Sequence, residues 1–333
     1  MKRILVGTDF SPESHQALAH ALKIARRLDA TLLLAHAGTR LEPMAAALAP
    51  ESAALIEYQK IIAEHDIENR SRLAELVREV QAQGIKAEEH LVDGFADTAL
   101  RDAAEALDVD LVVIGTHGRT GLKRLLLGSV AERVVRLCRR HVLVARVIGS
   151  EVGERDLSYR RVLVPTDFEP LSEQALEIAL QLVEPGGEVE LFHSWHLPLT
   201  TTMMPGRVGE AAIEQVRVSI EEGARAKAQA LIERHAASGA SINVTIFNES
   251  PSRAISERAE EGKHDLIVMG GHGHRGLSRW ILGSTAEATV RHAPCSVLVV
   301  HARAEEGRAH GVIPRDPVSG SGGDRSGGKP ASD

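Results

Sequence analysis

One glycine-rich stretch occurs twice in this chain, and its residues are suited to holding an anion. The first copy runs from Ile114-Gly115-Thr116-His117-Gly118 to Gly128-Ser129, and the second from Met269-Gly270-Gly271-His272-Gly273 to Gly283-Ser284. Glycine lets the backbone adopt positive φ and lets a bulky ligand come close. The first N–H groups of a helix that starts at each Gly-Ser pair would point at that ligand. The pattern predicts a site for a chain of phosphate groups.

The elements around each copy can be predicted from hydrophobicity. Apolar runs at residues 111–114 and 266–269 precede the glycines, and helical patterns follow Ser129 and Ser284. Strand, loop and helix would therefore follow one another in both copies. A tight turn that binds nothing is the alternative interpretation, and the repetition weakens it.

At these residues the chain resembles a known family. The spacing Gly-x2-Gly-x9-Gly-Ser after a buried strand resembles the nucleotide-binding motif of the universal stress proteins, and both copies fit it without a gap. The resemblance covers roughly residues 1–147 and 158–302, joined by a polar linker at 148–157. It implies an α/β fold of two tandem Rossmann-like domains, of the adenine nucleotide alpha hydrolase-like type. Each would be an open five-stranded parallel sheet flanked by helices.

The order of the expected elements supports this fold independently. In the first repeat we expect strands at residues 4–6, 31–35, 86–92, 111–114 and 142–147, with helices at 11–28, 52–83, 95–107 and 129–137. In the second repeat we expect strands at 161–164, 188–192, 243–247, 266–269 and 297–300, with helices ending near 182, within 210–237 and at 251–260. Such alternation predicts parallel, doubly wound sheets. Residues 303–333 should form a disordered tail, because Gly, Ser, Pro and charged residues dominate them.

Ligands of open α/β sheets bind beyond the carboxyl ends of the strands, where strand order reverses. The resemblance assigns Asp9 and Asp167 to ribose hydroxyls, the backbone at Ala37 and Ser194 to adenine, and the glycines with their serines to phosphates. The expected nucleotide-binding residues are Thr8, Asp9, Ala37, Ile114, Gly115, Gly118, Arg119, Gly128, Ser129 and Val130 in the first repeat, and Thr166, Asp167, Ser194, Met269, Gly270, Gly273, His274, Gly283, Ser284 and Thr285 in the second. The implied ligand is ATP, and Mg²⁺ would enter with its phosphates, held by water and by Asp9 or Asp167.

Several of these residues have a second interpretation. Asp9 and Asp167 could be helix-capping acids, and His36 and His193 at the strand ends are more often packed than catalytic. Ligand contact and solvent exposure are equally open for the loop histidines His117 and His272. Arginines beside the loops could neutralise phosphates or simply lie in solvent; these are Arg119, Arg124, Arg275 and Arg279.

The two copies differ in ways that leave the second the weaker candidate. Pro165 stands where the first repeat has Gly7, and Glu169 replaces Ser11, which adds a negative charge near the start of a helix. The second loop also loses two hydroxyl groups, because Gly271 and Arg275 replace Thr116 and Thr120.

Composition narrows the class of function. A net charge of −7 argues against non-specific nucleic-acid binding, which needs a basic face. No apolar run is long enough for a membrane span, and two cysteines in 333 residues fit a cytoplasmic protein. Neither a Gly-x4-Gly-Lys-Ser/Thr loop nor a Gly-x-Ser-x-Gly elbow is present, so the sequence favours a non-catalytic ATP-binding sensor of the stress response. The alternatives are a nucleotide-independent interaction module and slow ATP hydrolysis or autophosphorylation on Ser129 or Thr120.

The fifth strand of each repeat predicts how the repeats associate. Residues 142–145 and 297–300 would form sheet edges that are too apolar to stay unpaired. We therefore expect the two edges to pair within the chain. The sequence does not decide on a further homodimer, nor does it identify a protein partner.

Overall fold

The computed structural model describes residues 1–38, 53–116, 127–146, 157–196, 210–272 and 282–302. Residues 1–302 form one compact unit. The expected tail at 303–333 and nearly all of the expected linker at 148–157 lie outside the described residues. The division into two domains stays a prediction.

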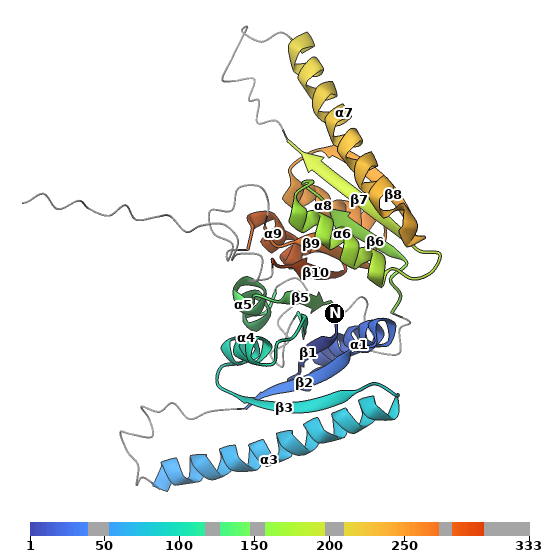
Figure 1. Cartoon of the computed structure of the whole chain (residues 1–333). Helices are drawn as coiled ribbons and strands as arrows, with labels where there is room; N and C mark the ends of the chain where they lie inside the picture. Colours follow the sequence, from blue (N-terminus) through green and yellow to red (C-terminus); the bar gives the residue numbers. More distant parts are fainter. Residues whose placement is uncertain (39–52, 117–126, 147–156, 197–209, 273–281, 303–333) are drawn as a thin grey trace, which may run out of the picture. The chain divides into compact units, whose positions relative to one another are not determined.

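Both repeats alternate strand and helix as the sequence predicts (Figure 1). The first repeat contains β1 (Arg3–Gly7), α1 (Pro12–Leu28), β2 (Thr31–Gly38), α3 (Ala53–Ala82), β3 (Ala87–Asp93), α4 (Ala96–Ala106), β4 (Leu111–Gly115), α5 (Ser129–Leu137) and β5 (His141–Ala145). The second contains β6 (Arg161–Pro165), α6 (Pro170–Leu182), β7 (Glu188–Trp195), α7 (Glu210–His235), the short helix η1 (Ala236–Ser238), β8 (Ser241–Asn248), α8 (Pro251–Glu261), β9 (Leu266–Gly270), α9 (Ser284–His292) and β10 (Ser296–Val300).

Differences from the expected bounds are confined to element ends. β7 runs three residues further than predicted because its last residues, Ser194 and Trp195, pair with β8. β5 ends at Ala145, short of the predicted 147, because the N–H of Arg146 donates to Ser296 Oγ (3.0 Å).

The described strands form one sheet in the order β3-β2-β1-β4-β5-β10-β9-β6-β7-β8. Strands are parallel within each repeat, whereas β5 and β10 pair antiparallel in the register Val144 with Val297, Leu143 with Leu298 and Val142 with Val299. The predicted pairing of the two apolar edges is therefore confirmed. Backbone pairing between the repeats makes the ten strands a single sheet.

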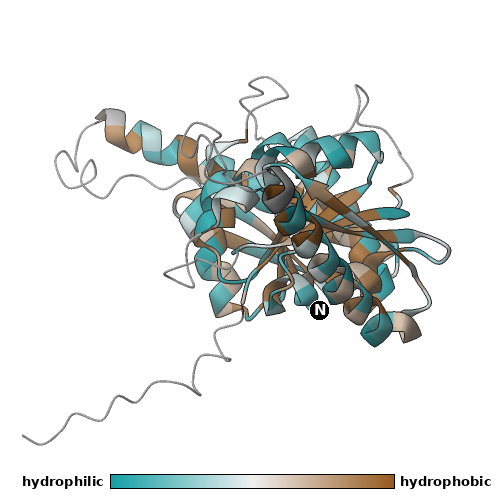
Figure 2. Ribbon diagram, turned by 90° about the horizontal axis from the view of Figure 1, so that it is seen from above, coloured by the Kyte–Doolittle hydropathy of each residue, from teal (hydrophilic) through white to brown (hydrophobic). Residues whose placement is uncertain are grey.

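Apolar residues on both faces of the strands build two layers of core. The core layer that contains Ile4 and Val6 of β1 also holds residues of α1, α3, α6 and α7, whereas the layer that contains Leu5 holds residues of α4, α5, α8 and α9. Successive strand residues point to opposite faces, so a strand covered on both faces must be apolar throughout. Figure 2 shows the hydrophobic strands enclosed by helices that are hydrophilic outside. None of the described helices combines the length and apolar character needed to cross a bilayer.

A buried polar chain joins the repeats beside β5 and β10. The two ring nitrogens of His20 in α1 lie 2.6 Å from the hydroxyl of Tyr159 and 3.1 Å from Ser296 Oγ. Burial, together with the nearby charge of Lys23, lowers the pKa of His20 to about 4, so the imidazole is neutral at pH 7. Burial raises the pKa of the Tyr159 hydroxyl. At the periphery of this contact Lys23 pairs with Glu184.

Candidate functional site

The strand order places a topological switch point at the carboxyl ends of the central strands of each repeat. β1 lies between β2 and β4, and β6 lies between β7 and β9. The chain leaves β1 toward β2 and returns on the other side through β4, which makes the β1–β4 boundary a switch point. Asp9 therefore follows the strand next to Gly115, and Asp167 follows the strand next to Gly270.

A short turn fixes each of these aspartates. Asp9 Oδ1 accepts hydrogen bonds from the backbone N–H (3.0 Å) and the hydroxyl of Ser11, and Ser11 Oγ caps α1 by accepting from Ser14 N (3.3 Å). Asp167 Oδ1 accepts from the N–H of Glu169 (3.1 Å), but the Glu169 side chain makes no capping bond to α6. Asp9 thus holds Ser11, the residue that caps α1. In the second repeat Glu169 stands in place of Ser11, and α6 lacks the corresponding side-chain cap.

The threonine before each aspartate turns its hydroxyl inward. Thr8 Oγ1 accepts from the N–H of Phe10 (3.0 Å) and lies 3.1 Å from Ser14 Oγ. Thr166 repeats both contacts, with Phe168 N at 2.9 Å and Ser172 Oγ at 3.0 Å. Both phenylalanines adopt a left-handed backbone with φ near 60°, which these bonds help to hold. The hydroxyls of both threonines are therefore bonded within the turns that carry the aspartates.

The histidines of the second strands brace the same turns. His36 Nδ1 lies 2.7 Å from Thr8 O, and His193 Nδ1 lies 2.8 Å from Thr166 O. Each imidazole packs on the phenylalanine of its own turn, with ring centroids 4.7 Å apart. Burial lowers the pKa of His193. These contacts favour the packed interpretation of both histidines.

Each glycine-rich stretch leads into the start of the next helix. α5 begins at Ser129 with Gly128 as its N-cap, and α9 begins at Ser284 with Gly283 as its N-cap. Gly128 N donates to Thr116 O (2.8 Å), and Gly283 N donates to Gly271 O (2.7 Å), so the two ends of each stretch meet. Neither N-cap makes a side-chain bond to its helix, and both serines are exposed. The first N–H groups of these helices are suited to an anion.

The remaining expected residues fall into three groups. Ala37 and Ser194 lie near the ends of β2 and β7, and Ser194 Oγ donates to Glu249 O (2.6 Å). The side chains of Ile114 and Met269 are buried in the core, whereas Val130 is exposed and Thr285 half-buried in the first turns of their helices. Four further residues, Gly118, Arg119, Gly273 and His274, lie outside the described residues, as do His117, Arg124, Arg275 and Arg279.

Comparison with known proteins agrees with this architecture. The model of the universal stress protein family matches residues 1–146 and 158–301. The chain belongs to the universal stress protein family. A universal stress protein of Methanocaldococcus jannaschii is 33% identical over 145 residues, which are 44% of this chain and 82% of that protein. One of Mycolicibacterium smegmatis is 27% identical over 304 residues, covering 90% of this chain and 97% of the relative.

A solved structure extends the likeness to the whole fold of this universal stress protein. The crystal structure of a universal stress protein from Archaeoglobus fulgidus superposes with a TM-score of 0.62 at 24% identity, covering 90% of this chain and 98% of the other. The α/β fold with Rossmann-like repeats is therefore shown.

One glycine of this universal stress protein is required by packing. A Cβ atom on Gly115 would lie 2.8 Å from the carbonyl oxygen of Glu13 in α1, whereas the atom nearest to one on Gly270 would be Cγ of the flexible Leu171 at 3.3 Å. We expect Gly115→Ala to lower the free energy of unfolding by about 1–3 kcal/mol, because backbone must move. Gly270→Ala serves as the control and should cost under about 1 kcal/mol. Equal losses in urea denaturation would contradict this reading of Gly115.

The residue after strand five distinguishes the two sites, and sequence analysis missed it. In the second repeat the ring of His301 occupies the place of a side chain on Gly271, 3.2 Å from where its Cβ would be. In the first repeat the equivalent residues are Thr116 and Arg146, and the Arg146 guanidinium donates to the carbonyls of Val290 and Arg291 at the end of α9. The only signal in the sequence was the position of both residues directly after an apolar edge strand.

Proposed function

We propose that this universal stress protein binds ATP at the switch point of each repeat and acts as a non-catalytic sensor in the cytoplasmic stress response. One observation carries the proposal. In both repeats a similar turn holds an aspartate directly after the central strand, β1 or β6. The neighbouring strand, β4 or β9, continues into the glycine-rich stretch, which leads to a helix N-terminus without a side-chain cap. A single copy of this arrangement is common in α/β proteins, whereas its repetition within one chain supports a shared ligand.

The groups at the strand ends and at the helix starts fit the parts of a nucleotide. A carboxylate accepts hydrogen bonds from two hydroxyls, so Asp9 and Asp167 suit a ribose. The N–H groups at the starts of α5 and α9 suit phosphates, to which a helix N-terminus contributes up to about 1 kcal/mol per charge. Mg²⁺ bound with the phosphates would neutralise part of their charge. Residues Ala37 and Ser194, beyond the second strands, are proposed to contact adenine.

One feature supports a binding role over catalysis. The histidines at the ends of the second strands, His36 and His193, are held by backbone carbonyls and packed on phenylalanine. Ligand at 100 times its dissociation constant would stabilise the bound state by about 2.7 kcal/mol, enough to bias a partner or oligomer equilibrium.

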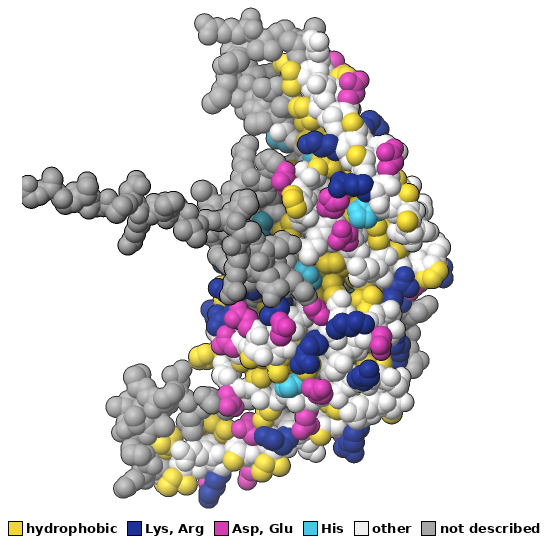
Figure 3. Space-filling model, in the orientation of Figure 1, with side chains coloured by type: hydrophobic (Ala, Val, Ile, Leu, Met, Phe, Trp, Pro, Cys, Tyr) yellow, Lys and Arg dark blue, Asp and Glu magenta, His cyan; other side chains and the backbone are white. Residues whose placement is uncertain are grey.

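Two further observations bear on location and on nucleic-acid binding. Cys138 and Cys295 are both free and buried, which fits the reducing cytoplasm that we propose. On the face shown in Figure 3, acidic and basic side chains are interspersed among the described residues, and this arrangement offers no extended basic surface to a nucleic acid there.

The test is calorimetric titration with Mg-ATP after native mass analysis of the purified protein. We expect one or two adenine nucleotides, with Gly118→Val abolishing binding to the first repeat and Gly273→Val to the second. Gly223→Val is the matched control, because Gly223 lies in α7 with open space around it. Absence of heat and of bound nucleotide in a folded protein would overturn the proposal. Release of ADP or phosphate incorporation on Ser129 or Thr120 would show catalysis instead.

A second function is favoured by one surface feature. The first half of α3 exposes large apolar side chains, with Ile56 and Ile61 each 46% exposed and Ile67 71% exposed. Exposed apolar residues along one helix are typical of a surface that contacts another protein. A nucleotide-independent interaction module would retain its partner after Gly118→Val and Gly273→Val, whereas a sensor would lose the ATP dependence of that contact.

A further inference from the structure

One carboxylate near the end of β2 has a buried oxygen atom without a hydrogen-bond partner. Oδ1 of Asp66 in α3 is buried, and no residue in the part of the chain that the structure describes donates to it. Among the Asp and Glu side chains of the described ranges, it is the only one with such an oxygen. A buried acceptor that is left unpaired is unfavourable, and a hydrogen bond from a ligand would offset that cost.

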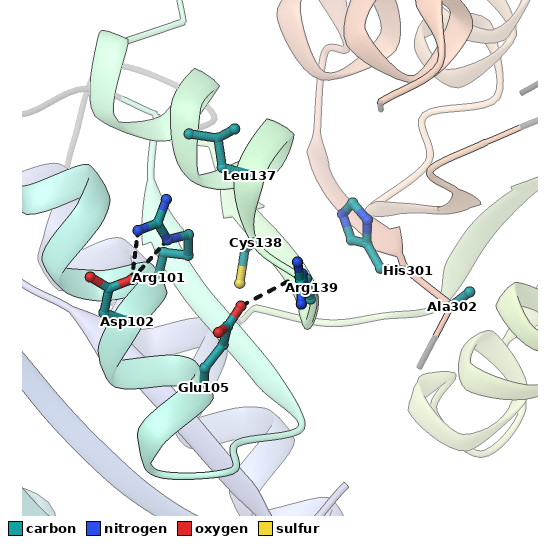
Figure 4. A pocket seen from close by; sticks show the side chains of 8 residues that line it. All are labelled: Arg101, Asp102, Glu105, Leu137, Cys138, Arg139, His301 and Ala302. Atoms are coloured by element: carbon teal, nitrogen blue, oxygen red, sulfur yellow. Dashed lines mark hydrogen bonds and ion pairs between the residues drawn. The ribbon is translucent and has the colours of Figure 1, made fainter. Parts of the chain in front are cut away.

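Carboxylates elsewhere in the first repeat have partners of their own. In the pocket lined by α4 and the end of α5, Asp102 accepts a hydrogen bond from Arg101 Nε (2.8 Å). Glu105 pairs with Arg139 Nε at 3.8 Å in the same pocket, as Figure 4 shows. The unpaired oxygen of Asp66 is therefore not a general feature of the acidic side chains of this repeat.

The fold places Asp66 beside the carboxyl end of β2. Gly38 is the last residue of that strand, and a Cβ atom on it would lie 3.3 Å from Asp66 Oδ1. Three and seven residues further along α3, Asn69 and Leu73 are buried, so Asp66 lies on the helix face that packs on the sheet. Asp66 Oδ1 therefore lies next to the strand end at which Ala37 is proposed to contact adenine.

The same helix also contacts the turn that carries Asp9. Arg72 Cζ lies 4.3 Å from the ring centroid of Phe10, the residue after Asp9. Phe10 packs on His36 of β2, with ring centroids 4.7 Å apart. α3 is therefore fixed both to the turn that is proposed to hold ribose and to the strand that is proposed to hold adenine.

Glu221 is the residue of the second repeat that corresponds to Asp66. Lys227 of α7 takes the place of Arg72, with Nζ 5.7 Å from the centroid of the phenylalanine ring in its own turn. Glu221 precedes Lys227 by the same number of residues by which Asp66 precedes Arg72. Glu221 Oε1 accepts a hydrogen bond from Arg217 NH1 (2.8 Å), so its charge is paired within α7.

The ends of the second strands differ as well. β7 ends at Trp195 where β2 ends at Gly38, and the indole is 8% exposed. A large side chain therefore stands in the second repeat where the first repeat has only a hydrogen atom beside Asp66. Within the described residues, the combination of an open strand end and an unpaired acceptor is confined to the first repeat.

We propose that Asp66 selects adenine in the first repeat by accepting a hydrogen bond from the exocyclic amino group of the base. The inference rests on the proposed function, because it concerns the base of the nucleotide bound there. Adenine presents N–H donors on this group, whereas guanine and hypoxanthine carry an acceptor oxygen at the same position. A carboxylate oxygen attracts the amino group and repels the oxygen. The second repeat should discriminate less, because its carboxylate is already paired.

The test is calorimetric titration of the full chain with Mg-ATP and, separately, with the magnesium complex of inosine triphosphate, whose base carries an oxygen in place of the amino group. Gly273→Val is introduced first, so that the first repeat alone is titrated. We expect ATP to bind about tenfold more tightly or better, the usual effect of one hydrogen bond to a charged group. Asp66→Asn should reduce this ratio to about twofold or less, because an amide can accept from the amino group or donate to the oxygen.

Glu221→Gln is the matched control, because Glu221 is paired with Arg217 in the other repeat, and it should leave the ratio unchanged. If Gly273→Val does not fold, the same comparison without it should alter the ratio at one of the two sites. ATP binding with an equal ratio in the starting protein and in Asp66→Asn would overturn this inference and leave the proposed function standing. Absence of binding by either nucleotide would overturn both.

Discussion

Replacing Arg258 with alanine is expected to lower the free energy of unfolding by about 3–5 kcal/mol, the usual cost of stranding a buried charge. Arg258 in α8 donates from Nε to Glu190 Oε1 (2.7 Å) and from NH2 to Oε2 (3.0 Å). Glu190 lies in β7 with its side chain 7% exposed, and His264 Nε2 lies 3.1 Å from Oε2. Removal of the guanidinium would leave the carboxylate buried with one partner fewer.

The first repeat provides the control for this network. Leu33, Ala103 and Val109 occupy the positions of Glu190, Arg258 and His264, and all three are buried in the same core layer. Replacing the whole set in the second repeat by these residues should leave stability within about 1 kcal/mol of the starting protein or raise it, because no charge is then stranded. Urea denaturation of both variants measures the difference. A triple variant as unstable as Arg258→Ala would contradict the explanation.

The pH dependence of the network has a definite sign. Burial raises the pKa of Glu190, but hydrogen bonds from His264 and Arg258 outweigh it and lower the pKa from 4.5 to about 2. A carboxyl group with a lowered pKa stabilises the folded state above its unfolded value. The contribution of the network is therefore full above pH 4.5 and is lost as the pH falls toward 2. The triple variant should lack this loss.

The fold could be predicted from sequence because it depends on patterns that recur along the chain. Apolar runs separated by helical segments indicate a parallel sheet. Two apolar edge strands, 142–145 and 297–300, must each be paired or covered, and pairing with each other achieves this within the chain. The antiparallel register of β5 and β10 then confirms that expectation. Hydrophobicity does not fix element ends, because single hydrogen bonds such as that from Arg146 N to Ser296 Oγ decide them.

The candidate sites could be predicted only in part. Position at a strand end places Asp9 and Asp167, but it does not reveal that the hydroxyls of Thr8 and Thr166 turn inward to hold the same turns. Orientation of a short side chain depends on neighbours such as Ser14, which only the three-dimensional turn identifies. Whether these residues bind nucleotide stays a prediction.

None of the polar contacts between distant segments described above was predicted from the sequence. Glu190, Arg258 and His264 come from a strand, a helix and a loop, and no spacing connects them. His20 and Tyr159 are separated by 139 residues. In the sequence of α1, His20 is a single polar residue with alanines on both sides, and nothing there indicates a partner. Pairing of this kind is set by the packing of whole elements.

The His20 contact leads to the second large effect, a loss of stability in mild acid. Burial lowers the pKa of His20 from 6.5 to about 4, so the unfolded chain takes up a proton at a higher pH than the folded one does. Stability is therefore full above pH 6.5 and falls as the pH drops toward 4. A shift of this size corresponds to about 3 kcal/mol at pH 4.

A double variant isolates this contribution. His20→Ile introduces isoleucine because Ile178 stands at the equivalent position of the second repeat. Tyr159→Phe removes the hydroxyl group that would otherwise lose its hydrogen-bond partner. His301, whose pKa is also lowered, is present in both proteins and cancels in the comparison. Urea denaturation between pH 7 and 4 should show a shallower loss for the double variant. Parallel curves would mean that His20 is not the group whose protonation loosens the contact between the repeats.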